Sequence, residues 1–214
     1  MKRRSFKIVL ASLIYLTKLF IVALTTTPGF AAESDLDTSF DGDGKATAGS
    51  FYEEGGRDVV IQPDGKIIVV GGKPSSYNIL GMAAIRYNAD GSLDATFGNN
   101  GVYILPTLVG SDFVSAKAVA VDLQPDGKIL LAGSGGKSSS PNQIFLIIRL
   151  NPSGSLDTTF GNGGRVIKDI GSSNTYGRLS SLVFDSTRDK IYVAGTTQIS
   201  PDGALYQSAL GIRL

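Results

Sequence analysis

A unit of about sixty residues occurs three times in this chain, and this repeat constrains the fold more than any other feature. The motif QPDGK occupies Gln62–Lys66 and Gln124–Lys128, and a diverged copy occupies Ser186–Lys190. The lysines that close the three copies are spaced 62 residues apart, at positions 66, 128 and 190. A constant period with a constant internal order is the signature of a repeat architecture, in which similar units stack on one another.

The centre of the motif predicts a hairpin turn. Proline presets the backbone for the first turn position, aspartate suits the second, and glycine supplies the positive φ that the third requires. The pairs Asp64-Gly65 and Asp126-Gly127 fulfil this pattern. In the third copy Arg188-Asp189 stands in their place, and aspartate adopts positive φ more readily than most residues. We therefore predict a hairpin in all three units.

Apolar runs around each turn predict four strands per unit. The runs after the turns, 67–70, 129–132 and 191–194, are continuously apolar, which indicates short strands buried on both faces. Further strands are predicted at 82–87, 145–150 and 208–214, and short ones beginning at Lys45, Val102 and Arg165. A single unit of this size could barely sustain a core, whereas four-stranded sheets stacked radially form a β-propeller. We predict an all-β, propeller-like protein with three four-stranded blades, at residues 35–87, 88–150 and 151–214.

A second motif, LDxxF, marks the boundaries of the repeats. It occurs at 36–40, 93–97 and 156–160, and it recurs together with an arginine that ends an apolar strand, at 86, 149 and 213. A charge near a core is normally paired, so we expect one Arg–Asp pair per blade; the alternative is a ring of arginines that binds an anion. The phenylalanines are expected to anchor the packing between blades. The residues concerned are Arg86, Arg149, Arg213, Asp37, Asp94, Asp157, Phe40, Phe97 and Phe160.

The pattern QPDGKI followed by IRYNxDGSLDxTFGxxG resembles the delta-60 repeat family of bacterial proteins, over roughly residues 35–214. The resemblance implies propeller-like blades and no established biochemical function. Three blades fall short of the four to eight that close a propeller. The units are therefore part of a longer propeller, or form a ring completed by further chains, or make an open arc with unpaired edges.

The first 31 residues are typical of a secretory signal peptide. A basic start is followed by a mostly apolar stretch and by small residues that suit cleavage after Ala31. The alternative is an uncleaved anchor, but Lys18 interrupts the apolar stretch, and a charge in the bilayer core is costly. We expect a protein that is secreted or held in a bacterial cell envelope, with no membrane segment after cleavage.

Composition excludes several chemistries. The chain has 20 basic and 19 acidic residues, and removal of a leader with five basic residues leaves a net charge of −4. Nucleic acid is therefore not an expected partner, since phosphate binding needs a basic stripe. The absence of histidine removes the Ser-His-Asp triad and His-ligated zinc, and the absence of cysteine removes disulfides and thiolate chemistry.

Calcium is the best chemical hypothesis for the aspartate-rich loops, and no other cofactor is expected. Hard oxygen ligands on a glycine-containing loop suit Ca²⁺. However, no loop has the full twelve-residue calcium pattern, and local turn geometry is the alternative role for these side chains. The candidates are Asp35, Asp37, Asp41, Asp43, Asn88, Asp90 and Asp94.

We expect an exported, non-catalytic module that binds a protein or glycan partner. A homo-oligomer is one way in which the propeller can be completed. One alternative is a secreted carbohydrate-active enzyme that uses loop carboxylates. Another is a structural spacer within a larger surface protein. A binding module predicts an exposed apolar or aromatic patch, whereas an enzyme predicts two carboxylates facing each other in a pocket.

Overall fold

The computed structural model describes residues 35–48, 55–74, 80–105, 113–137, 140–169, 176–199 and 206–214. The chain divides into a unit up to Asp37 and a unit from Thr38 to Leu214, and every strand lies in the second. The predicted leader, residues 1–31, lies outside the described residues. None of the described segments forms a helix that is long and apolar enough to cross a membrane.

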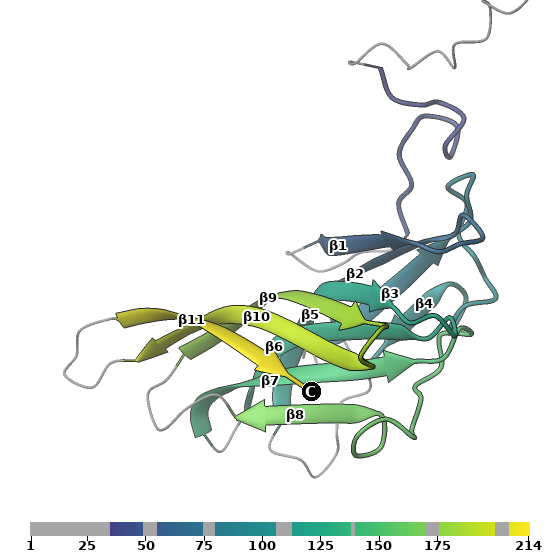
Figure 1. The fold of residues 1–214 in the computed structure, drawn as a ribbon. Helices are drawn as coiled ribbons and strands as arrows, with labels where there is room; N and C mark the ends of the chain where they lie inside the picture. The colour runs from purple at the N-terminus through teal and green to yellow at the C-terminus, as the bar shows by residue number, and fades with distance from the viewer. Residues whose placement is uncertain are drawn as a thin grey trace, which may run out of the picture. The chain divides into compact units, whose positions relative to one another are not determined.

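In the described part of the chain, eleven strands form three antiparallel sheets, each with its strands in chain order (Figure 1). The first sheet contains β1 (Gly56–Ile61), β2 (Ile67–Pro74), β3 (Leu80–Tyr87) and β4 (Val102–Ile104). The second contains β5 (Phe113–Leu123), β6 (Ile129–Lys137), β7 (Ser140–Leu150) and β8 (Arg165–Asp169). The third contains β9 (Tyr176–Asp185), β10 (Lys190–Ile199) and β11 (Tyr206–Arg213). The all-β, propeller-like fold class is confirmed, although the third sheet has three strands among the described residues, not four.

The hairpin turns form as the sequence predicts. Gly65 and Gly127 have φ of +83° and +81°, in the region that glycine adopts without strain. Asp189 in the third copy has φ of +52°, which confirms that it takes the glycine position there. Strand β9 pairs with β10 across this turn, so the hairpin survives the change of sequence.

The fourth strand of each complete sheet comes after an LDxxF motif. Val102 and Arg165 begin β4 and β8, as predicted, and each pairs with the preceding strand of its own sheet. The prediction of a strand beginning at Lys45 is wrong, because residues 45–48 form no strand. A strand needs a hydrogen-bonding partner, and no described strand precedes Lys45 in the chain.

Two apolar layers stack the sheets in chain order. We call the face of each sheet that is directed toward the following sheet its front face, and the opposite face its back face. In the first layer the front of the first sheet meets the back of the second through Ile68, Val70, Met82, Ala84, Val121, Ile129, Leu131, Leu146 and Ile148. In the second layer the front of the second sheet meets the back of the third through Leu130, Ala132, Phe145, Ile147, Leu182, Ile191 and Val193.

The central position of the second sheet explains its apolar sequence. Residues 129–132 are all fully buried, two directed to each layer, so the prediction of a strand buried on both faces is confirmed there. The third sheet differs, since Ile191 and Val193 are buried but Tyr192 is half-buried and Ala194 is exposed. Its front face has no sheet against it among the described residues.

Polar bonds fix the register between sheets. The Asp58 carboxylate accepts a hydrogen bond from the Val121 N–H at 2.9 Å, and the Asp122 carboxylate accepts one from the Phe184 N–H at 2.7 Å. Each of these bonds joins the first strand of one sheet to the first strand of the next. A carboxylate that receives a backbone N–H makes a charge-assisted bond, which favours one register over its neighbours.

Candidate functional site

An arginine, an aspartate and a lysine meet in the first repeat. Arg86 Nε lies 2.8 Å from Asp94 Oδ2, and Lys66 Nζ lies 2.8 Å from the same oxygen. The Thr96 hydroxyl donates to the other carboxylate oxygen at 2.6 Å. Every member comes from a repeated motif, because Lys66 closes QPDGK, Arg86 nearly ends β3 and Asp94 belongs to LDxxF. Asp94 is buried, so these partners replace the water that it loses.

The second repeat contains the same arrangement. Arg149 Nε lies 2.7 Å from Asp157 Oδ2, Lys128 Nζ lies 3.1 Å from it, and the Thr159 hydroxyl donates to Asp157 Oδ1 at 2.6 Å. The expected Arg–Asp pair is therefore present in both repeats. The lysine and threonine were not assigned a role from the sequence. Their recurrence at the repeat period was the sequence feature that could have indicated this role.

Each of these arginines also stacks on an aromatic ring. The guanidinium carbon of Arg86 lies 4.6 Å from the centre of the Phe97 ring, and that of Arg149 lies 4.7 Å from the Phe160 ring. The carboxylate binds the Nε edge of each guanidinium and the ring covers its face, in a favourable cation–π geometry. This arrangement supports a structural role for Arg86 and Arg149, because little of either guanidinium group is left to bind an external anion.

The two paired aspartates are held in the ionised form. Burial acts to raise the pKa of Asp94, but hydrogen bonds from Lys66 and Thr96 and the charge of Arg86 outweigh it. For Asp157 the Thr159 hydroxyl is the largest cause of a lowered pKa, aided by Lys128 and Arg149. Both pKa values lie well below the ordinary range. A carboxylate so stabilised is a poor proton donor at neutral pH.

The LDxxF loop of one repeat docks on the turn of the next. The Gly98 N–H donates to Ser153 O at 2.8 Å, and Arg86 Nη1 donates to Pro152 O at 2.7 Å. Gly154 has φ of +83°, and a Cβ added to it would lie 2.6 Å from the Gly98 nitrogen. Only glycine therefore allows Phe97 and its loop to approach the following repeat this closely.

The same contact occurs one repeat earlier. The Asp41 N–H donates to Asp90 O at 2.7 Å, and a Cβ added to Gly91 would lie 3.2 Å from the Phe40 ring. Phe40 thus lies beside the turn at residues 88–91, as Phe97 lies beside the turn at residues 151–154. Both are positioned to anchor the packing between repeats.

The calcium candidates do not converge in the part of the chain that the structure describes. No group of three or more acidic side chains there is arranged to hold a metal ion. Asp94 is occupied by its cations, and Asp90 accepts two bonds from Ser92, from its N–H at 3.0 Å and its hydroxyl at 2.6 Å. Asp43 likewise accepts the Lys45 N–H at 2.9 Å.

The remaining calcium candidates also belong to no such group of acidic side chains among the described residues. Asn88 donates to the Ser92 hydroxyl at 3.0 Å, which supports turn formation. Asp35, Asp37 and Asp41 are exposed. The carboxylates of Asp64 and Asp126 accept the N–H of the lysine two residues on, at 3.2 Å each, within their hairpin turns. Calcium binding stays a prediction without a described ligand set.

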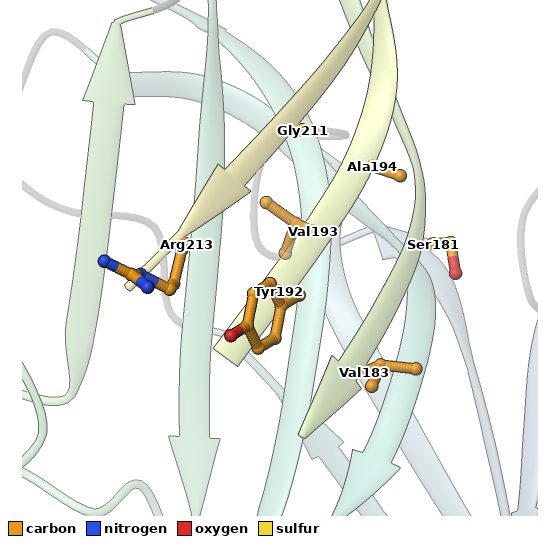
Figure 2. A pocket seen from close by; sticks show the side chains of 7 residues that line it. All are labelled: Ser181, Val183, Tyr192, Val193, Ala194, Gly211 and Arg213. Carbon is orange, nitrogen blue, oxygen red and sulfur yellow. The ribbon is translucent and has the colours of Figure 1, made fainter. Parts of the chain in front are cut away.

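Arg213, the third repeated arginine, lies in a different environment. It is exposed and lines a hollow of about 630 Å³ on the front face of the third sheet (Figure 2). The hollow is lined by Ser181, Val183, Tyr192, Val193, Ala194, Gly211 and Arg213, from all three strands of the sheet. Arg213 forms no ion pair with any described residue. The sequence predicted a paired Arg213 and gave no sign of this exposed face.

Two stretches of the chain match a known family model. Residues 62–97 and 124–160 match the family described as "Domain of unknown function (DUF5122) beta-propeller". The matched stretches contain the hairpin, the third strand and the LDxxF motif of the first two repeats, and together they cover less than half of the chain. A search of curated proteins finds no match. The chain therefore has a β-propeller fold, and two of its repeats are similar to those of a propeller family of unknown function.

Proposed function

We propose that this chain is an exported, non-catalytic binding module of the delta-60 repeat type, and that it binds a protein through the front face of its third sheet. One observation carries this proposal. Positions on the second sheet that are covered by the following sheet have counterparts on the third sheet that no described sheet covers. Leu130 and Ala132 on the second sheet are fully buried, whereas their counterparts Tyr192 and Ala194 are not. Val183 on the same face is 55% exposed.

The chemistry of this face suits a protein surface. An aromatic ring, a valine and an arginine surround a hollow, and aromatic residues and arginine are enriched at protein interfaces. Burial of the exposed apolar area would supply the driving force, and Arg213 would select a partner with a carboxylate. An exposed apolar patch bordered by polar groups is a recognised mark of an interaction site.

The alternative of a carbohydrate-active enzyme finds less support. Glycoside hydrolysis uses two carboxylates about 5 to 9.5 Å apart around the scissile bond. None of the described residues that line the hollow on the third sheet is acidic. Asp94 and Asp157 are each bound to an arginine and a lysine, which favours a structural role for these carboxylates over a catalytic one.

A photo-crosslinking experiment tests the binding face. A photoreactive phenylalanine analogue placed at Tyr192 in the native host is expected to give a covalent protein adduct. The matched control carries the same analogue at Asp64, an exposed position in the turn of the first sheet. Adducts at both positions, or at neither, would contradict the proposed face.

Export is tested separately. The N-terminus of the protein from the cell envelope or medium is expected to be Ala32, as shown by intact mass. A protein that keeps Met1 and stays in the cytoplasm would refute export without affecting the binding face.

A further inference from the structure

We propose that the layer between the first and second sheets contains a binding site for a small carboxylate, formed by Tyr103 on β4 and Arg165 on β8. The site is separate from the front face of the third sheet, so it does not depend on the proposed function. The Tyr103 hydroxyl and the Arg165 Nε are both buried, and neither has a hydrogen-bond partner among the described residues. Buried polar atoms are nearly always satisfied, so these two require an explanation.

The strand register directs both side chains into the same layer. Tyr103 pairs with Ala84 on β3, and Arg165 pairs with Ile148 on β7. Residues directly opposite each other on neighbouring strands share one face of the sheet. Ala84 and Ile148 both belong to the first apolar layer, as Tyr103 itself does. Tyr103 therefore enters this layer from the first sheet, and Arg165 enters it from the second.

The two groups lie near enough to influence each other. Tyr103 is 9% exposed, and burial raises the pKa of its hydroxyl to about 12, while the positive charge of Arg165 acts in the opposite direction. Arg165 is half-buried and forms no ion pair with any residue that the structure describes. Because the arginine reaches solvent and the tyrosine hydroxyl does not, a ligand would enter past the guanidinium and meet the hydroxyl at the inner end.

Comparison of the repeats shows that the fold does not need this polar pair. Counted from the phenylalanine of LDxxF, Tyr103 corresponds to Val166, and Arg165 corresponds to Val102. Val166 packs against the second apolar layer, which is the place that Tyr103 has in the first. Valine buries no polar atom, so it fills either position without the cost of an unsatisfied donor. Packing alone therefore does not account for the tyrosine and the arginine.

The chain itself shows which ligand this pair of donors fits. In the first repeat Arg86 Nε donates to one oxygen of the Asp94 carboxylate at 2.8 Å, and a threonine hydroxyl donates to the other at 2.6 Å. The second repeat has the same arrangement, at 2.7 and 2.6 Å. Tyr103 and Arg165 offer the same two donors, a hydroxyl and a guanidinium Nε, and no described carboxylate binds them. An arginine N–H can only donate, so the ligand accepts hydrogen bonds and carries negative charge.

The apolar layer around the hydroxyl limits the size of this ligand. Tyr103 shares a buried cluster with Met82, Leu105 and Ile148, which are all at most 4% exposed. A bulky group could reach the hydroxyl only if the two sheets separated and exposed these apolar side chains to water, which is unfavourable. The expected ligand is therefore a free molecule little larger than its carboxylate group, and acetate is the simplest probe for it.

The experiment measures the melting temperature at pH 7, by circular dichroism, while sodium acetate replaces sodium chloride at constant ionic strength. The protein is used as its host processes it, and the melting temperature of the wild type is expected to rise with acetate concentration by mass action. Tyr103→Phe and Arg165→Val should each weaken acetate binding about tenfold or more, because each deletes a hydrogen bond to a charged group. The matched controls are Tyr87→Phe, at another buried tyrosine of the first sheet, and Arg178→Val, at an exposed arginine on β9. Both controls should respond to acetate as the wild type does.

A rise in the wild type and both controls that is lost in Tyr103→Phe and Arg165→Val supports the carboxylate site. An unchanged melting temperature of the wild type overturns it, and so does an equal rise in every variant, which would be a general effect of acetate. A parallel titration uses an aspartate blocked at both ends, and a response to this probe without one to acetate would assign the carboxylate to a polypeptide and overturn the small ligand. Tyr103→Phe removes only an unsatisfied hydroxyl, so it is expected to fold even where Arg165→Val does not.

Discussion

Removal of the Arg86 guanidinium is expected to destabilise this protein more than removal of its repeat counterpart, Arg149. The change to methionine in each case keeps an apolar stem of similar length and deletes the charge. Both arginines bind an aspartate and stack on a phenylalanine at nearly the same distances. Among the described residues they differ in one bond, since Arg86 Nη1 donates to Pro152 O of the following repeat at 2.7 Å and no such bond is seen for Arg149.

The expected magnitudes follow from these contacts. Loss of one partner from a buried ion pair costs about 3–5 kcal/mol, but Asp94 retains Lys66 at 2.8 Å, which reduces the loss to about 2 kcal/mol. The bond from Arg86 to Pro152 O is charge-assisted and adds about 1.5 kcal/mol. We therefore expect Arg86→Met to lower the free energy of unfolding by about 3.5 kcal/mol, and Arg149→Met by about 2 kcal/mol.

Urea unfolding at pH 7, followed by circular dichroism at one protein concentration, measures both losses. A constant concentration is needed because any self-association would add to the apparent stability. The two variants should unfold with the slope of the wild type, so that the midpoints report stability alone. Equal losses in the two variants would refute the reasoning, because they would show that the bond between repeats contributes nothing.

Three further predictions concern single side chains. Gly154→Ala should lower the free energy of unfolding by about 3 kcal/mol, because it adds a clash with Phe97 to the strain of positive φ. Gly163→Ala, at a position with φ of +60° and open space, should lower it by about 1 kcal/mol in the same urea assay. Similar losses of stability in the two variants would contradict the clash. Asp157→Asn should destabilise the folded protein at pH 7 and do so less at pH 3. The pKa of Asp157 is lowered in the folded state, so its ionised form contributes stability above the unfolded-state pKa near 3.8, and this contribution is lost as the pH falls further. A loss of stability in the variant that does not change with pH would exclude this linkage. Burial raises the pKa of Tyr103 to about 12, and its hydroxyl has no hydrogen-bond partner among the described residues, so Tyr103→Phe should keep or raise the melting temperature; a clear loss would reveal a partner for that hydroxyl.

Much of the structural site was predictable because its members are close in sequence and recur. Arg86 and Asp94 are separated by only eight residues, and Asp94 accepts bonds from Thr96 two residues further on. The environment of Arg213 was not predictable in this way. The same motif residue is buried in the first repeat and exposed in the third, because burial depends on which sheet lies against it and not on the residue itself.

The sequence by itself determined the repeat period, the hairpin turns and the strands on either side of them. These depend on local backbone preferences, as Gly65 and Asp189 show with their positive φ. Only the tertiary structure decided which sheet each fourth strand joins and which faces are covered. Both depend on partners far away in the chain, such as Pro152 for Arg86, 66 residues apart, or a partner strand for Lys45, which no described strand supplies. A repeat motif specifies one unit, whereas the number and order of neighbouring units decide what that unit leaves exposed.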